Sequence, residues 1–181
     1  MIKKILVAMD HSINAIQSFE VAMEIAEYCH ARLMLLHVLS IEGEGYQAHP
    51  VFPGTYLYPA FSDIPLNRFQ QEWKKYKEKE LHRLVILAEQ AKLVGITTEI
   101  TQKFGNPRQE ICDFAKEWNA DLILMGSRGH SGVKELVLGS ISNYVVHHAL
   151  CSVMVVRTPN QLAVQPSTNS SAEQLRSMIS T

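Results

Sequence analysis

The chain has 181 residues, of which 17 are Lys or Arg and 18 are Asp or Glu, so its formal net charge is -1. This balance argues against a protein that binds nucleic acid through many phosphate contacts, because such proteins usually carry a strong basic excess. Hydrophobic residues make up 46% and charged residues 19% of the chain, which excludes wholesale disorder and predicts one globular domain with a tail or a long insertion.

Targeting signals and cysteine usage indicate where the protein works. The apolar run Ile5–Met9 stops at Asp10, too early for a secretion signal, and no apolar run approaches the roughly 18 residues of a membrane-spanning helix. Cys29, Cys112 and Cys151 are far apart and odd in number, so they suggest neither a disulfide framework nor a zinc site. We expect a cytoplasmic protein with buried free thiols that binds neither membranes nor nucleic acid.

The first 40 residues predict a β-α-β unit. Ile5–Met9 is continuously apolar and Leu33–Leu39 is apolar except for His37, as expected for strands of a parallel sheet that is covered on both faces. Between them, Ser12 is suited to cap a helix from about Ile13 to His30. The apolar residues of this helix recur every three or four positions and share one face: Ile16, Phe19, Met23 and Ala26.

The segment 41–67 lacks any hydrophobic periodicity and predicts a long irregular insertion. It is rich in Gly and Pro and also contains the aromatic residues Tyr46, Phe52, Tyr56, Tyr58 and Phe61. A loop of this length inside a compact domain usually has a function, and simple disorder is poor in aromatic residues. We interpret the insertion as a flap or a contact surface for a partner.

The rest of the chain alternates helices with strands. A helix from about Arg68 ends before Gly95, which is suited to the position just past a helix end, and Asn106 with Pro107 is typical of a helix start. The expected elements are helix 68–93, strand 97–102, helix 107–118, strand 121–125, helix 140–149 and strand 153–157, followed by a polar tail from residue 158.

This alternation predicts an α/β domain with a mainly parallel sheet. In such a sheet the right-handed crossovers bring the carboxyl ends of all strands to one edge, and ligands bind there at a topological switch point. The sites to inspect are therefore the turns that follow the strands, above all the glycine-rich segment after residue 125.

That segment has the pattern Gly-x2-Gly-x9-Gly-Ser, formed by Gly126, Gly129, Gly139 and Ser140. Gly126 and Gly129 allow positive φ and a close backbone approach to a ligand, and the amides of this loop could form an anion nest. The helix that begins at Gly139-Ser140 would direct unpaired amides and a positive dipole end at a phosphate, with Arg128 or His130 adding charge. A glycine-rich turn with an ordinary Ser N-cap explains the pattern equally well at this stage.

Several other patterns favour structural interpretations. His37 lies in an apolar strand and is expected to be a core histidine with its hydrogen bonds satisfied. His147 and His148 are adjacent, point about 100° apart on a helix and are poorly placed to chelate a metal together. The charged run Lys74–Lys79 is typical of a solvated helix face, and no Walker motif occurs.

Four segments together resemble the universal stress protein family, specifically its ATP-binding branch. They are Val7-Ala8-Met9-Asp10-His11-Ser12, Leu35-Leu36-His37-Val38, the glycine pattern after Met125, and the final helix and strand over 148–157. The resemblance covers about residues 2–158, with Ser152 standing where the family often has proline. It implies an open five-stranded sheet in the order 3-2-1-4-5 with helices on both faces, similar to adenine-nucleotide alpha hydrolases, and a nucleotide between strands one and four.

The resemblance also implies a set of nucleotide-binding residues. Asp10 would contact the base or ribose, although it could instead be a carboxylate that the helix dipole favours at a helix start. Val38 would line the adenine pocket. The full set is Met9, Asp10, Val38, Met125, Gly126, Arg128, Gly129, Gly139, Ser140 and Ser142, of which the residues from Arg128 onward would surround the phosphates.

The resulting hypothesis is a cytoplasmic nucleotide-dependent stress or signalling switch that binds ATP with Mg²⁺. It is expected to comprise a domain over 1–158 and a tail over 159–181, and to form a homodimer by pairing the apolar edge strand Val153–Arg157 with its symmetry mate. No general base can be named, so ATP hydrolysis is expected to be slow at most. The alternatives are an interaction module whose pocket is empty or binds AMP or cyclic AMP and whose insertion 46–61 recruits a partner protein, or a genuine hydrolase or nucleotidyl transferase on the same fold.

Overall fold

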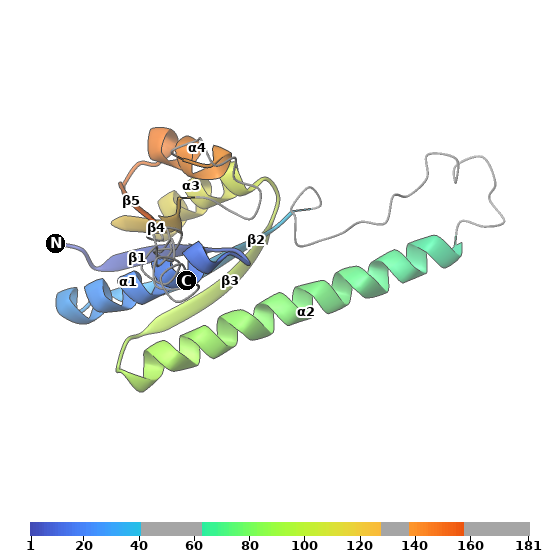
Figure 1. Cartoon of the computed structure of the whole chain (residues 1–181), viewed down its shortest axis with the longest axis horizontal. Helices are drawn as coiled ribbons and strands as arrows, with labels where there is room; N and C mark the ends of the chain where they lie inside the picture. The colour runs from blue at the N-terminus through green and yellow to red at the C-terminus, as the bar shows by residue number, and fades with distance from the viewer. Residues whose placement is uncertain (41–62, 128–137, 158–181) are drawn as a thin grey trace, which may run out of the picture.

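The computed structural model of the chain describes residues 1–40, 63–127 and 138–157 (Figure 1). Within these ranges the chain alternates five strands with four helices. Their order is β1 Lys4–Met9, α1 Ile13–Cys29, β2 Arg32–Leu39, α2 Asp63–Leu93, β3 Thr98–Phe104, α3 Pro107–Trp118, β4 Leu122–Gly126, α4 Ser140–His148 and β5 Ser152–Val156.

The strands form one parallel sheet in the order β3-β2-β1-β4-β5, which confirms the predicted fold class. β1 pairs with β2 from Lys4–Arg32 to Met9–His37, and β4 pairs with β5 from Leu122–Ser152 to Gly126–Val156. Because every strand runs in the same direction, the carboxyl ends of β1, β2 and β4 meet at one edge of the sheet.

The sheet separates two apolar clusters. One cluster packs α1 and α2 against alternate residues of the central strands, including Val7 and Leu35. The other packs α3 and α4 against the residues between them, including Leu6 and Leu36. The helices therefore form a layer on each face, and the continuous apolar runs of β1, β2 and β4 follow from burial on both sides.

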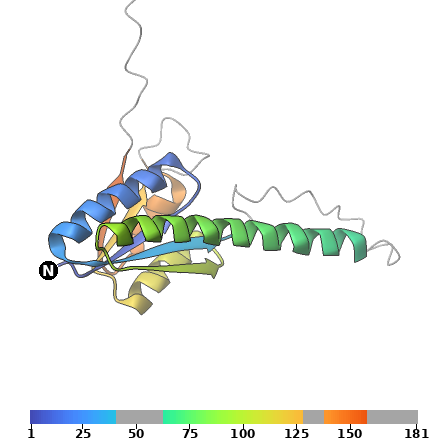
Figure 2. The ribbon, with the colours of Figure 1, turned by 90° about the horizontal axis from the view of Figure 1, so that it is seen from below.

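Helix α2 is longer than the sequence predicts and extends beyond the sheet at its N-terminal end (Figures 1 and 2). The prediction that residues 63–67 belong to an irregular insertion is wrong, since α2 begins at Asp63. Pro65 is compatible with this start because the amides of the first helical turn have no partner within the helix, so a proline there loses no hydrogen bond. The segment 41–62 lies outside the described residues.

The predicted helix ends are confirmed where a side chain or a glycine specifies them. Ser12 accepts a hydrogen bond from the Ala15 amide at 3.1 Å, and Asn106 accepts one from the Arg108 amide at 3.0 Å. After α2, Gly95 has φ +82, and the amides of Gly95 and Ile96 donate to the last carbonyls of the helix at 2.9 and 3.0 Å. This pattern is a Schellman motif, which favours glycine at this position.

The remaining predictions on the body of the fold have mixed outcomes. The three cysteines are free, as predicted, but half-buried instead of fully buried. The run Lys74–Lys79 is mostly exposed and includes the Lys74–Glu78 ion pair of one helix turn, which confirms a solvated face. No helix of the described residues is both long and apolar enough to cross a membrane.

Candidate functional site

The centre of the carboxyl edge is the gap between β1 and β4. The two strands pair only as far as Val7–Leu124, two residues before their ends at Met9 and Gly126. β2 lies on the other side of β1, and β5 lies on the other side of β4. The chain connections therefore diverge here, which is the arrangement that defines a topological switch point, where open parallel sheets commonly have a ligand-binding crevice.

The apolar residues of the predicted site divide between the two faces of the sheet. Val38 and Met125 both pack with the cluster on the α3/α4 face, as their assignment to one pocket requires. Met9 is buried in the cluster on the α1/α2 face, so its side chain does not join them.

Asp10 follows β1 directly and is partly buried. Its Oδ1 accepts hydrogen bonds from the amide of Ser12, at 2.8 Å, and from the Ser12 hydroxyl. Both bonds hold the carboxylate at the start of α1. They support the structural role considered for Asp10, and they also fix the orientation in which it could accept bonds from ribose hydroxyls.

The two ends of the glycine-rich loop are joined at its base. The carbonyl of Ser127 accepts a bond from the Gly139 amide at 2.7 Å and lies 2.9 Å from the Ser142 hydroxyl. The same hydroxyl lies 3.0 Å from the Gly139 carbonyl. Ser142 is only 2% exposed, so in this arrangement it positions the loop base and the first turn of α4.

α4 begins at Ser140, as predicted, and of the two interpretations of this turn the structure contradicts the Ser N-cap. Its N-cap is Gly139, with φ -71 and ψ 164, and it has no side-chain cap bond; Ser140 is the first helical residue and is exposed. The interpretation of this turn as an ordinary Ser N-cap is therefore wrong. Because glycine has no side chain to satisfy them, the first amides of α4 have no side-chain cap among the described residues and are suited to an external acceptor.

The structure describes the backbone of Gly126 but not that of Gly129. In the described part of the chain the glycines with positive φ are Gly95 and Gly105, so Gly126, the last residue of β4, does not use the positive φ that glycine allows. Arg128 and Gly129, and with them the proposed anion nest, lie outside the described residues.

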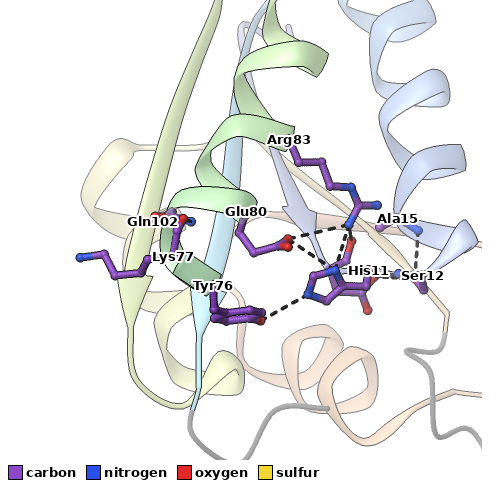
Figure 3. Close-up of polar contacts among 9 residues, drawn as sticks. His11, Ser12, Ala15, Tyr76, Lys77, Glu80, Arg83 and Gln102 are labelled. Atoms are coloured by element: carbon purple, nitrogen blue, oxygen red, sulfur yellow. Dashed lines mark hydrogen bonds and ion pairs between the residues drawn. The ribbon is translucent and has the colours of Figure 1, made fainter. Parts of the chain in front are cut away.

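A polar cluster that the sequence analysis did not identify lies beside Asp10, on the α1/α2 face (Figure 3). Tyr76, Glu80 and Arg83 project from α2 toward His11. The Arg83 guanidinium donates to the Asp10 carbonyl at 2.9 Å and lies 3.3 Å from His11 Nδ1, while Tyr76 Oη lies 3.3 Å from His11 Nε2. One sequence signal could have revealed this cluster: Glu80 precedes the buried residues Leu84, Leu87 and Ala91 at helical spacing, which places a carboxylate on the apolar face of α2.

His37 belongs to the same neighbourhood, and the expectation that its hydrogen bonds are satisfied is wrong. Its ring is 5% exposed, and its buried Nδ1 has no hydrogen-bond partner among the described residues. Burial lowers the pKa of His37 from 6.5 to about 4, with a smaller contribution from the positive charges of His11 and Arg83. His11, His37 and Glu80 are the described residues that could hold a metal ion.

The comparisons with known proteins agree with this geometry. A model of the universal stress protein family matches residues 1–157. The universal stress protein Sll1388 of Synechocystis sp. is 32% identical over 154 residues, a match that covers 85% of this chain and 97% of that protein. The structure of hypothetical protein MJ0577 aligns with a TM-score of 0.70 and 25% identity, covering 88% of this chain and 99% of that one.

A further solved structure, of a universal stress protein family protein from Arabidopsis thaliana with AMP bound, has a TM-score of 0.60 and 23% identity and covers 91% of this chain and 97% of that one. The strand order defines an α/β protein with a topological switch point between β1 and β4, the place where ligands bind in open parallel sheets. The chain belongs to the universal stress protein family.

Proposed function

We propose that the chain binds ATP, with Mg²⁺ held through the phosphates, in the crevice between β1 and β4, and that it acts as a cytoplasmic nucleotide-dependent stress-response or signalling switch. The observation that carries this proposal is the uncapped N-terminus of α4. Open helix amides and the positive end of the helix dipole bind phosphate without any net basic charge. This agrees with a chain whose formal charge is only -1.

The residues around the crevice supply the other contacts of the proposed site. The Asp10 carboxylate, fixed by Ser12, would accept bonds from ribose hydroxyls, and Val38 and Met125 would pack against the base on the α3/α4 face. Gly126 would border the nucleoside with Met125. The residues around the phosphates would be Arg128, Gly129, Gly139, Ser140 and Ser142, of which Ser142 also positions the base of the loop. The proposed domain covers 1–158, with 159–181 as a tail.

The proposed assembly is a homodimer formed through Val153–Arg157. β5 is an edge strand of the sheet, and Met154 on it is 40% exposed. Pairing two copies of β5 would satisfy the open backbone groups of this edge and cover its apolar side chains. Light scattering by the full chain tests this assembly.

An adenine nucleotide other than ATP is the second candidate ligand, because a structural relative was solved with AMP bound. In that case the chain would act as an interaction module, with the insertion 46–61 recruiting a protein partner. ATP hydrolysis is proposed to be slow at most, since no described residue of the crevice is placed as a general base for an attacking water.

Calorimetry on chain stripped of nucleotide separates these candidates. We expect heat of binding for ATP that depends on Mg²⁺, and weaker binding in Gly129→Ala. Tighter binding of AMP or cyclic AMP would replace ATP by the second candidate, and no heat or thermal shift with any adenine nucleotide would overturn the proposal. Mass spectrometry of nucleotide released from freshly purified protein provides an independent readout.

A further inference from the structure

Three potential metal ligands from three separate elements converge on the α1/α2 face. His11 lies in the turn after β1, His37 near the end of β2 and Glu80 on α2. One ligand atom of each lies within 4.8 Å of the others, and His11 Nδ1 is 3.4 Å from Glu80 Oε2. The rings of His11 and His37 are perpendicular, with centroids 5.9 Å apart. Figure 3 shows Glu80 pointing from α2 toward His11.

The surroundings of this cluster leave polar groups poorly satisfied. Glu80 is 3% exposed, yet its carboxylate lies 3.4 Å from His11 and 3.9 Å from Arg83, longer than the 2.7–2.9 Å of a good charge-assisted hydrogen bond. The buried Nδ1 of His37 has no hydrogen-bond partner among the described residues. A buried polar atom without a partner costs about 1–3 kcal/mol, so the Nδ1 of His37, close to the loosely paired carboxylate of Glu80, indicates that another group binds here.

We propose that His11, His37 and Glu80 bind one divalent transition-metal ion, with Zn²⁺ as the ion that fits best. Two imidazole nitrogens and one carboxylate oxygen form a ligand set that zinc accepts, with water in a fourth position. Zinc holds such ligands at about 2.0–2.2 Å in tetrahedral geometry, which places neighbouring ligand atoms about 3.4 Å apart. The His11–Glu80 distance already has this value, and His37 needs only a small side-chain movement.

The positive charge of Arg83 is expected to oppose metal binding at this site. Its guanidinium lies 3.3 Å from His11 Nδ1, the atom that faces Glu80, and a positive charge there repels a cation and competes for the same lone pair. The Arg83 side chain is 31% exposed and can turn toward solvent when the metal binds. Removal of its charge should therefore strengthen metal binding.

The metal site and the proposed nucleotide site use different side chains. His37 and Glu80 lie on the α1/α2 face, whereas Val38 and Met125 lie on the α3/α4 face. Metal binding is therefore independent of the proposed function and is measured in the absence of nucleotide.

The experiment titrates the metal-free full chain with Zn²⁺ against a chelating dye, and with Co²⁺ followed by its visible absorption. We expect one ion per chain and the intense absorption bands of low-coordinate Co²⁺. His37→Phe and Glu80→Gln should each weaken Zn²⁺ binding by about 100-fold, because each removes one of three ligands. His82→Ala, which removes an exposed histidine from the same helix, should leave the affinity unchanged.

Arg83→Gln should raise the Zn²⁺ affinity by about tenfold, since it removes a charge about 3–4 Å from two of the ligands. A gain of this kind cannot result from misfolding, which keeps the proposal testable even where a ligand variant is unstable. Absence of stoichiometric binding, unchanged binding in His37→Phe and Glu80→Gln, or loss of binding in His147→Ala instead would each overturn the proposal.

Discussion

The two faces of the sheet present different chemistry at the same carboxyl edge. On the α3/α4 face, Val38 and Met125 provide an apolar surface beside the open amides of α4. On the α1/α2 face, His37 meets His11, Glu80 and Arg83 in a buried polar cluster. Since His37 and Val38 are consecutive residues of β2, the alternation of side chains along a strand is sufficient to separate two neighbouring sites.

Burial has opposite consequences for the side chains on the two faces. Apolar residues on the α3/α4 face gain stability from burial without any partner, whether or not the proposed ligand is bound at α4. The ionisable groups on the α1/α2 face lose hydration, and their direct contacts restore only part of it. We therefore expect the stability of the second face, but not that of the first, to depend on pH.

The largest expected effect is the pH dependence of the α1/α2 face in metal-free protein. The unfolded chain protonates His37 near pH 6.5, while the folded chain does so only near pH 4. Between these values the unfolded state binds more protons, so the free energy of unfolding should fall as the pH drops from 6.5 to 4, by about 3 kcal/mol in total.

His37→Phe should abolish this part of the pH dependence, because the apolar ring cannot take up a proton. Urea unfolding at several pH values in the presence of a chelator provides the measurement. Other charged or titratable groups also face or surround His37, namely His11, Asp10, Glu80 and Arg83. The contribution of His37 is therefore the difference in pH dependence between the natural chain and His37→Phe. If His37→Phe retains the full pH dependence of the natural chain, His37 is not the source of the pH-dependent stability of the α1/α2 face.

A smaller effect is expected when a negative charge is placed at the start of α4. Ser140→Glu should weaken ATP binding by about tenfold, because the carboxylate repels phosphates and competes for the helix amides. The same charge interacts favourably with the helix dipole, so the nucleotide-free protein should be as stable as before or slightly more stable. Opposite changes in affinity and stability would show that the helix end serves a ligand.

Gln109→Glu is the matched control for Ser140→Glu. It introduces the same charge in the first turn of α3, also at an exposed position. Calorimetry and thermal unfolding of both variants give the comparison. Equal losses of ATP affinity in the two variants would indicate a general electrostatic effect instead of a phosphate site at α4.

The smallest effects concern the two helix caps. Ser12→Ala and Asn106→Ala should each lower the free energy of unfolding by about 1 kcal/mol, because each removes one bond to an open helix amide. Only Ser12→Ala should also weaken nucleotide binding, because Ser12 holds the Asp10 carboxylate. Similar nucleotide affinities in the two variants would mean that Asp10 is a structural residue of the helix start.

Local signals allowed most of the fold to be predicted from the sequence. Continuous apolar runs predicted β1, β2 and β4, and Ser12, Gly95 and Asn106 marked helix boundaries that the structure has. The start of α2 was misplaced because the Gly- and Pro-rich segment before it hides the first helical turn, in which Pro65 is tolerated. The sequence pattern also could not reveal that Gly139, and not Ser140, occupies the cap of α4.

By itself the sequence determined the alternation of strands and helices, the glycine pattern after β4 and the resemblance to a family, because these depend on residues close together in the chain. The tertiary structure decided which distant side chains meet. His11, His37 and Glu80 come together only because α2 packs beside β2 and β3, and Val38 is separated from His37 only because the sheet is covered on both faces. Packing between elements, and not local propensity, therefore created the polar cluster beside Asp10.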